Sequence, residues 1–512
     1  MPARAPALSR RHLLLAPPLL LVACGSLGRE APPNDACATP RGRARACEEE
    51  KADLALVEAR TGEEYVDHGV RPFVPAAADA LSTFSVDVDT GSYTVSRRKL
   101  REGTLPPPAA VRAEEFVNFF RPGVPAPVDA AFHVQAEAAA SPFRPGKTLL
   151  RVALQARRSS LRERKPANLV FLVDTSGSMR SPDKLPLVIR SLSLLTETLR
   201  DDDRVAVCTY AGDVRVVLPP TWGSEREGIL AALRGLEASG STAMGSGIAQ
   251  AYDLAARMAG PGRTSRVFVC SDGDANVGPT SHEEILRTIE RQRARGVTLG
   301  TVGFGMGNYR DGLMEQLADR GDGSYAYVDS EAEARRLFQE DLVSSLELVA
   351  RDAKVQVAFD PARVARYRLI GYENRAILDE QFRDDAVDAG EVGAGHAVTA
   401  LYELELVPGS AGPMGEVRLR WREAEPLPEQ AASELVTPLP AEPAATFAAA
   451  PARFRVQACA GELAEVLRRS PHVSTRPEEL LPLLEAALDP RGDEREQELL
   501  ELVRRAAILA GS

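Results

Sequence analysis

The sequence predicts an α/β protein centred on a doubly wound, mostly parallel sheet, with a β-rich region and a C-terminal helical segment beside it. Two strand-like runs, 169–173 and 266–270, lead directly into acidic and hydroxyl side chains. Runs of this kind are typical of buried parallel strands. Between 165 and 350, strand-like and helix-like stretches alternate. After residue 351 the pattern changes to strands separated by turn-rich segments, and the last part of the chain is helical in pattern.

The first 23 residues have the features of a targeting segment. Basic residues precede an apolar stretch, 13–22, that is too short and too interrupted by proline to span a membrane. Residues 21–25, Leu-Val-Ala-Cys-Gly, resemble the lipobox of a bacterial lipoprotein signal. That resemblance implies cleavage before Cys24 and lipid attachment to it, which would anchor the protein stably. We therefore expect 1–23 to be a signal peptide and 24–80 a flexible tether. The protein is expected in the bacterial envelope, with the outer membrane or the periplasmic face favoured.

Ordered structure is expected from residue 81, in a region, 81–164, that precedes the doubly wound sheet. Apolar and polar residues alternate along 81–89, which predicts a half-buried strand whose Asp87 and Asp89 face the solvent. Further patterns predict helices at 91–100 and 113–120, and strands at 132–138 and 148–156.

The region 165–350 is expected to form the doubly wound sheet. Residues 204–210 and 214–218 flank a tight turn and predict a hairpin, which gives this sheet one antiparallel edge strand. The other expected strands are 169–173, 266–270, 297–302 and 324–328, and the expected helices are 184–199, 226–236, 243–258, 283–295, 311–318 and 332–346.

The region 351–425 is expected to be rich in β-structure and to pack with the strands that precede residue 156. Its predicted strands are 354–359, 364–371, 397–407 and 416–421. Residues 426–451, rich in Ala, Pro and Glu, are expected to be a linker that contains one strand at most. The C-terminal region, 452–512, is expected to be helical, with helices at 461–469, 477–488 and 494–509.

Polar side chains follow two central strands at the points where the strands end. Asp174, Ser176 and Ser178 stand at alternate positions after one strand, Asp272 follows the other, and Thr242 precedes a helix. Open α/β sheets bind ligands at the carboxyl ends of their strands. An all-oxygen donor set suits a hard cation such as Mg²⁺ rather than zinc or copper. Taken singly, each of these residues is equally well explained as a helix cap or a turn residue.

In this order and spacing, Asp174-x-Ser176-x-Ser178, Thr242 and Asp272 resemble the metal-ion-dependent adhesion site of the von Willebrand factor A (VWA) domain. Integrin I domains contain the same kind of site. The resemblance covers 165–350. It implies a divalent metal, Mg²⁺ with Mn²⁺ and Ca²⁺ as alternatives. The two serines and the threonine would face the ion, and the aspartates would bind it directly or through water.

A second resemblance covers the region before the sheet. The segments Phe84-Ser-Val-Asp-Val-Asp-Thr-Gly-Ser-Tyr93, Leu105-Pro-Pro-Pro108 and Glu114-Glu-Phe-Val-Asn-Phe-Phe120 resemble the N-terminal region of a bacterial envelope family. Members of that family join this region to a VWA domain and a C-terminal region of unknown function, often behind a lipoprotein signal. The resemblance therefore implies architecture rather than purpose.

Composition and motifs exclude several functions. The net charge of −11 argues against nucleic-acid binding, which requires a basic surface. The sequence has no GxSxG, HExxH or GxxxxGK[ST] motif, and its six histidines fall in no pattern that would activate a nucleophile. We therefore expect no enzymatic activity and no nucleotide ligand.

The leading hypothesis is an envelope-anchored lipoprotein that binds a protein partner through the metal. Because neutral hydroxyls leave the ion electrophilic, the partner is expected to supply an acidic side chain. Two alternatives remain open at this point. One is a structural scaffold that needs no metal. The other is an assembly subunit for a AAA-type ATPase, as some bacterial VWA proteins are, although the lipobox disfavours it.

Five of the six cysteines fall into three groups, and the sixth, Cys459, lies near the start of a predicted helix. Cys24 is assigned to the lipid anchor. Cys37 and Cys47 are a candidate disulfide in an oxidising compartment. Cys208 and Cys270 lie in apolar strand patterns and are expected to be buried thiols.

Overall fold

The computed structural model describes residues 65–511 apart from short gaps at 87–88, 160–163, 241–243, 274–281, 306–310, 342–345, 385–386, 388, 425–430 and 490. The expected signal peptide, most of the tether, Cys24, the candidate pair Cys37 and Cys47, Asp87 and Thr242 lie outside the described residues. Within the described part of the chain, no helix combines the length and apolar composition needed to cross a bilayer.

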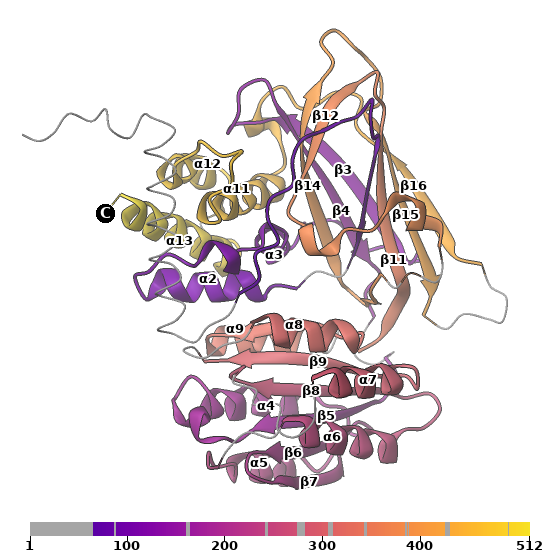
Figure 1. Cartoon of the computed structure of the whole chain (residues 1–512), viewed down its shortest axis with the longest axis vertical. Coiled ribbons are helices and arrows are strands. Elements are labelled where there is room, and N and C mark those ends of the chain that lie inside the picture. The colour runs from indigo at the N-terminus through magenta and orange to yellow at the C-terminus, as the bar shows by residue number, and fades with distance from the viewer. Residues whose placement is uncertain are drawn as a thin grey trace, which may run out of the picture. The chain divides into compact units, whose positions relative to one another are not determined.

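A six-stranded sheet forms the doubly wound part of the fold, in the order β10-β9-β8-β5-β6-β7 (Figure 1). Neighbouring strands are parallel except for β7, which pairs antiparallel with β6 as the hairpin pattern predicts. The strands are β5 (Ala167–Asp174), β6 (Arg204–Tyr210), β7 (Val214–Trp222), β8 (Thr264–Ser271), β9 (Val297–Phe304) and β10 (Tyr325–Val328). The predicted α/β fold class is thereby confirmed.

Helices cover both faces of this sheet because β5 and β8 are apolar toward both sides. One core joins the strands to α4 (Leu185–Thr198), α5 (Arg226–Arg234) and α9 (Glu331–Arg335). The core on the other face includes α6 (Met244–Met258), α7 (His282–Arg293) and α8 (Asp311–Arg320). Cys208 and Cys270 are buried free thiols in these strands, as expected. The expected helix at 332–346 is not one continuous α-helix, because α9 ends at Arg335 and leads into a π-helical turn, Arg336–Asp341.

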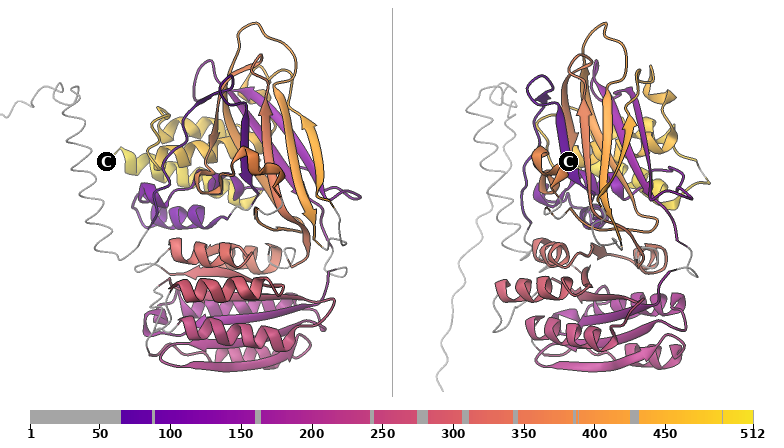
Figure 2. Two further views of the ribbon diagram at one scale, coloured as in Figure 1. Left: turned by 45° about the vertical axis from the view of Figure 1, so that its right-hand side comes forward. Right: turned by 90° about the vertical axis from the view of Figure 1, so that its right-hand side faces the viewer.

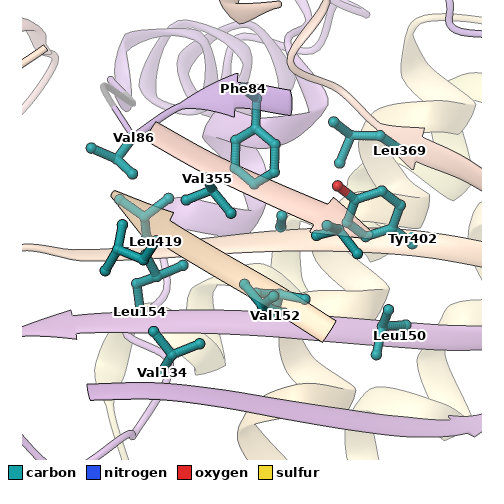
Figure 3. Packing of buried hydrophobic residues seen from close by; sticks show 14 of the residues in the cluster. Phe84, Val86, Val134, Leu150, Val152, Leu154, Val355, Leu369, Tyr402 and Leu419 are labelled. Carbon is teal, nitrogen blue, oxygen red and sulfur yellow. The ribbon is translucent and has the colours of Figure 1, made fainter. Parts of the chain in front are cut away.

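The remaining strands form two sheets that pack face to face as a β-sandwich. One sheet has the order β1-β12-β14-β4-β3, and the other β13-β11-β15-β16 with β2 on β11. Figure 3 shows side chains from both sheets, including Phe84, Val152 and Leu419, meeting in one core. The strands are β1 (Val74–Pro75), β2 (Leu81–Ser85), β3 (Phe132–Ala140), β4 (Thr148–Ala156), β11 (Leu348–Phe359), β12 (Val364–Ile370), β13 (Val392–Gly393), β14 (Ala397–Leu406), β15 (Gly415–Glu423) and β16 (Ser433–Pro438).

The expected packing between early and late strands is present, because β4 pairs with β14 and β2 pairs with β11. Helices cover the outer face of the β12-β14-β4 sheet, where Leu149, Ile370 and Leu401 join a helical core. These helices are α2 (Gly91–Arg101), α3 (Ala113–Asn118), α11 (Ala452–Leu467), α12 (Leu481–Glu485) and α13 (Glu494–Ala510). Figure 2 shows the C-terminal helices, in yellow, on one side of the sandwich. The C-terminal segment is thus helical as expected, although α11 begins earlier than the predicted 461.

The expectation that Asp89 faces the solvent is wrong. The residue is only 3% exposed. It accepts a hydrogen bond from the Tyr325 backbone N–H at 2.8 Å and pairs with Arg375 at 2.9 Å. The strand ends at Ser85, and Asp89 lies against β10 of the doubly wound sheet. The alternation of buried and exposed residues expected for a single strand therefore does not extend to Asp89.

Candidate metal site

The predicted site residues that the structure describes lie at the carboxyl ends of adjacent parallel strands. Asp174 is the last residue of β5, and Asp272 directly follows β8. The chain leaves β5 to form β6 on one side and returns to form β8 on the other. Such a reversal of strand order is where open α/β sheets bind ligands. The fold therefore brings Asp174 and Asp272 to one edge of the sheet.

The two predicted serines lie beside Asp174 in a tight turn. The Ser176 backbone N–H donates to Asp174 Oδ1 at 2.8 Å, and Ser176 Oγ is 3.0 Å from Ser178 Oγ. Gly177 starts a short 3-10 turn, Gly177–Arg180, for which the extended backbone of Ser176 provides the N-cap. The alternate spacing thus puts two hydroxyl oxygens side by side, next to a buried carboxylate.

Thr242 lies outside the described residues, but the loop that leads to it is anchored on the same turn. The Gly177 N–H donates to the Gly240 carbonyl at 3.1 Å, and the Ser239 N–H donates to the Thr175 carbonyl at 2.7 Å. Gly240 has φ +85, and a Cβ there would lie 3.0 Å from the Gly212 nitrogen. This close backbone approach requires glycine.

The pKa of the Asp174 carboxyl is raised from 3.8 to about 6, mainly by burial and also by the nearby charge of Asp272, against hydrogen bonds from Ser176 that lower it. A buried carboxylate next to a second one is costly unless a cation is near. The edge of the sheet therefore favours positive charge at this point.

Three residues near the site did not feature in the predicted set. Ser271 Oγ donates to Asp174 Oδ2 at 3.2 Å. The Tyr210 hydroxyl is buried close to Asp174 and Ser271, and its pKa is raised by burial and by the charge of Asp174. Lys184 Nζ lies 2.8 Å from Asp272 Oδ2. Ser271 and Tyr210 each end a strand, a position that could have flagged them, whereas no sequence signal distinguishes Lys184.

The donor chemistry fits a hard divalent cation. The side chains gathered here offer carboxylate and hydroxyl oxygens only, apart from the Lys184 ammonium. No group of three or more His, Cys, Asp or Glu residues that could hold a metal occurs within the described ranges. A metal at this edge would therefore depend on Ser176 and Ser178 as well as on the two aspartates.

Three protein-family models match the chain in succession. They are described as von Willebrand factor (residues 59–151), von Willebrand factor type A domain (168–341) and uncharacterized protein YfbK, C-terminal (344–437). The doubly wound sheet and the second of these matches define a VWA domain. The chain thus contains a VWA domain followed by a region that matches the YfbK C-terminal model.

Several proteins resemble this chain. Uncharacterized protein YfbK of Escherichia coli (strain K12) is 43% identical over 343 residues, which cover 65% of this chain and 60% of that protein. Uncharacterized protein sll0103 of Synechocystis is 30% identical over 37% of this chain and 45% of that protein. The human inter-alpha-trypsin inhibitor heavy chain H3 is 26% identical over 35% of this chain and 21% of that protein. The matches thus span 60% or less of these relatives.

Among solved structures, the von Willebrand factor type A protein from Catenulispora acidiphila covers 73% of this chain and 89% of its own, with a TM-score of 0.41 and 16% identity. The ArnB paralog VWA2 from Sulfolobus acidocaldarius covers 74% of this chain and 98% of its own, with a TM-score of 0.33 and 14% identity.

Proposed function

We propose that the protein is a non-enzymatic binding protein of the bacterial envelope, which recognises an acidic side chain of a protein partner through a divalent metal. Asp174, Ser176, Ser178, Thr242 and Asp272 would hold the ion, with Mg²⁺ preferred and Mn²⁺ and Ca²⁺ as alternatives. The observation that carries this proposal is the pair of hydroxyls 3.0 Å apart beside Asp174, at the switch point of the sheet.

Each of these residues has a defined part in the proposed binding. Asp174 and Asp272 supply the negative charge that a cation needs in a buried position. Ser176 and Ser178 supply neutral oxygens, which satisfy the coordination of the ion without cancelling its charge. When bound, the metal would act as an electrophile toward an incoming carboxylate. The VWA domain as a class supports a role in protein interaction.

A metal-independent scaffold remains the second candidate, and one contact favours it. Asp272 is already paired with the Lys184 ammonium at 2.8 Å, so this carboxylate does not need a metal to offset its burial. The two candidates differ in one measurable property, which is the response of the folded protein to divalent ions.

The proposal is tested by thermal unfolding of the purified full chain in EDTA and in excess Mg²⁺ or Mn²⁺. An ion that binds only the folded state raises the melting temperature, and at one hundred times its Kd it adds about 2.7 kcal/mol to the free energy of unfolding. We expect this rise in the wild type and its loss in Asp174→Ala and in Ser176→Ala/Ser178→Ala.

The matched control is Ser193→Ala. The Ser193 hydroxyl donates to the Ile189 carbonyl within α4 at 2.7 Å and lies away from the sheet edge, so its loss should leave the metal response unchanged. A wild-type melting temperature that is the same in EDTA and in both metals would refute metal binding and favour the scaffold.

The envelope location is part of the same proposal and rests on the lipobox at residues 21–25. Fractionation of cells that express the chain tests it. The wild type is expected in the membrane fraction, and Cys24→Ser, which removes the acylated thiol, is expected in the soluble fraction. Equal membrane association of the two forms would contradict lipid attachment at Cys24.

A further inference from the structure

Lys184 places an ammonium group inside the candidate metal site. Its Nζ lies 2.8 Å from Asp272 Oδ2, and the side chains of Lys184 and Asp272 are 10% and 0% exposed. Lys184 is also the N-cap residue of α4. A cation is unfavourable at a helix N-terminus, where the helix dipole is positive, so the ion pair with Asp272 must offset that cost.

The backbone around Lys184 fixes where its side chain can lie. The Lys184 N–H donates to the Ser181 carbonyl at 3.0 Å, and the Lys184 carbonyl accepts from Val188 at 2.9 Å. The stem of the side chain lies directly against Gly305, which follows β9 and has φ +71. A Cβ at Gly305 would lie 2.3 Å from Lys184 Cγ. The glycine therefore leaves the space that the lysine stem occupies.

A second set of contacts holds this arrangement from outside the VWA domain. Arg98 of α2 donates to Asp183 Oδ2 at 2.7 Å and to the Tyr327 hydroxyl at 3.1 Å. The Tyr327 hydroxyl in turn donates to the Gly305 carbonyl at 2.8 Å. The residue before Lys184 and the glycine beneath its stem are thus both tied to Arg98. A surface lysine would not need such support.

We propose that Lys184 is the specificity-determining residue of this site, an internal cation that makes the bound metal select an anionic ligand. This inference rests on the proposed metal site. Two aspartates alone would neutralise a divalent ion. With the Lys184 ammonium on Asp272, the metal-loaded site keeps one net positive charge, which attracts a carboxylate at short range in a partly desolvated position. The same ammonium lowers metal affinity, because it repels the ion and shares Asp272 with it.

The alternative role is purely structural. In that case Lys184 would only neutralise Asp272 and hold the start of α4, and its removal would destabilise the protein equally with and without metal. The two roles therefore differ in metal affinity and in anion affinity, and not in stability alone.

The experiment measures Mn²⁺ binding to the full chain by electron paramagnetic resonance of the free ion, in wild type and Lys184→Met. We expect Lys184→Met to bind Mn²⁺ at least about tenfold more tightly, the order of effect of removing one nearby charge. Acetate is then titrated against the Mn²⁺-loaded proteins, with water-proton relaxation as the readout. We expect its affinity to fall by about tenfold or more in the variant.

Three further variants make the result decisive. Lys184→Arg keeps the charge and should return both affinities toward the wild-type values. Lys184→Gln, which retains a donor for Asp272, should reproduce the shifts of Lys184→Met and serves if that variant does not fold. Lys147→Met is the control, because Lys147 pairs with Glu405 in the β-sandwich, and it should change neither affinity.

Two failures have different meanings. If the wild type and all variants bind no Mn²⁺, the proposed metal site is wrong and this inference falls with it. If the wild type binds Mn²⁺ but Lys184→Met and Lys184→Gln show wild-type affinities for Mn²⁺ and acetate, the metal site stands and Lys184 is only a structural tether.

Discussion

At the scale of single residues, buried ion pairs connect elements that lie far apart in the sequence. Arg368 in β12 bonds to Glu403 in β14 at 2.7 Å and to Glu465 in α11 at 2.8 Å, and all three side chains are 0% exposed. These ion pairs join the outer face of the sandwich to helix α11. Removing Arg368 takes one cation from each of these two buried carboxylates, which then keep only Arg144 and Arg468 as partners among the pairs described, and this loss costs more than the loss of a surface pair.

We therefore expect Arg368→Met to lower the free energy of unfolding by about 3–5 kcal/mol, measured by urea denaturation at neutral pH. Arg366→Met is the control on the same strand. The Arg366 side chain is 46% exposed and pairs with Glu405 at 3.6 Å, so its loss should cost about 0.5 kcal/mol or less. Equal effects of the two substitutions would show that burial does not determine the strength of these pairs.

The sequence predicts the acidic and hydroxyl residues of the candidate site better than the cations around them. Asp174 and Asp272 stand out because each ends an apolar strand. No such sequence feature distinguishes Lys184, Arg368 or the buried Asp89. Their ion-pair partners lie 88, 35 and 286 residues away along the chain. A charged residue in a polar stretch is expected to face water, and only the tertiary fold shows that it does not.

At the scale of elements, the predicted bounds agree best with the structure where the hydrophobic periodicity is strong. Strands β5, β6 and β8 are buried along most or all of their length, and their apolar runs locate them closely. Prediction fails where the periodicity is weak. Helix α11 is buried on most of its surface, so its first half shows no amphipathic pattern and its start at Ala452 was missed. Strand β16, which pairs with β15 among the described strands, lies in the stretch expected to be a linker with one strand at most, and its alternately exposed residues gave no bounds for that strand.

At the scale of the whole described chain, buried ion pairs join the VWA domain to the helices and the sandwich. Arg97 of α2 bonds to Asp329 after β10, and to Glu333 of α9 at 3.0 Å. Arg112, just before α3, bonds to Asp311 of α8 at 2.6 Å. Because these pairs are buried, we infer that the two parts unfold as one cooperative unit while the pairs remain ionised.

Acid should weaken this connection at Glu333. Burial alone would raise the pKa of the Glu333 carboxyl, but Arg336 and Arg97 outweigh it and hold the pKa below 4.5. A carboxyl with a lowered pKa stabilises the folded state above its unfolded pKa, and the stabilisation is lost as pH falls through the folded value. Glu333→Gln should therefore cost about 2 kcal/mol at pH 7, and its difference from the wild type should shrink progressively as the pH falls below about 4.5.

The two tryptophans make this prediction measurable in each part of the molecule. Trp222 lies in β7 of the VWA sheet and Trp421 in β15 of the sandwich, so Trp222→Phe and Trp421→Phe backgrounds each leave one reporter. Urea titrations at several pH values should give coincident midpoints for the two reporters at pH 7, which separate in acid and in Glu333→Gln. Glu331→Gln is the control on the same helix, because Glu331 is 58% exposed and pairs with Arg335 only at 3.6 Å. Midpoints that already differ at pH 7 in otherwise unmodified protein would mean that the buried pairs do not couple the two parts.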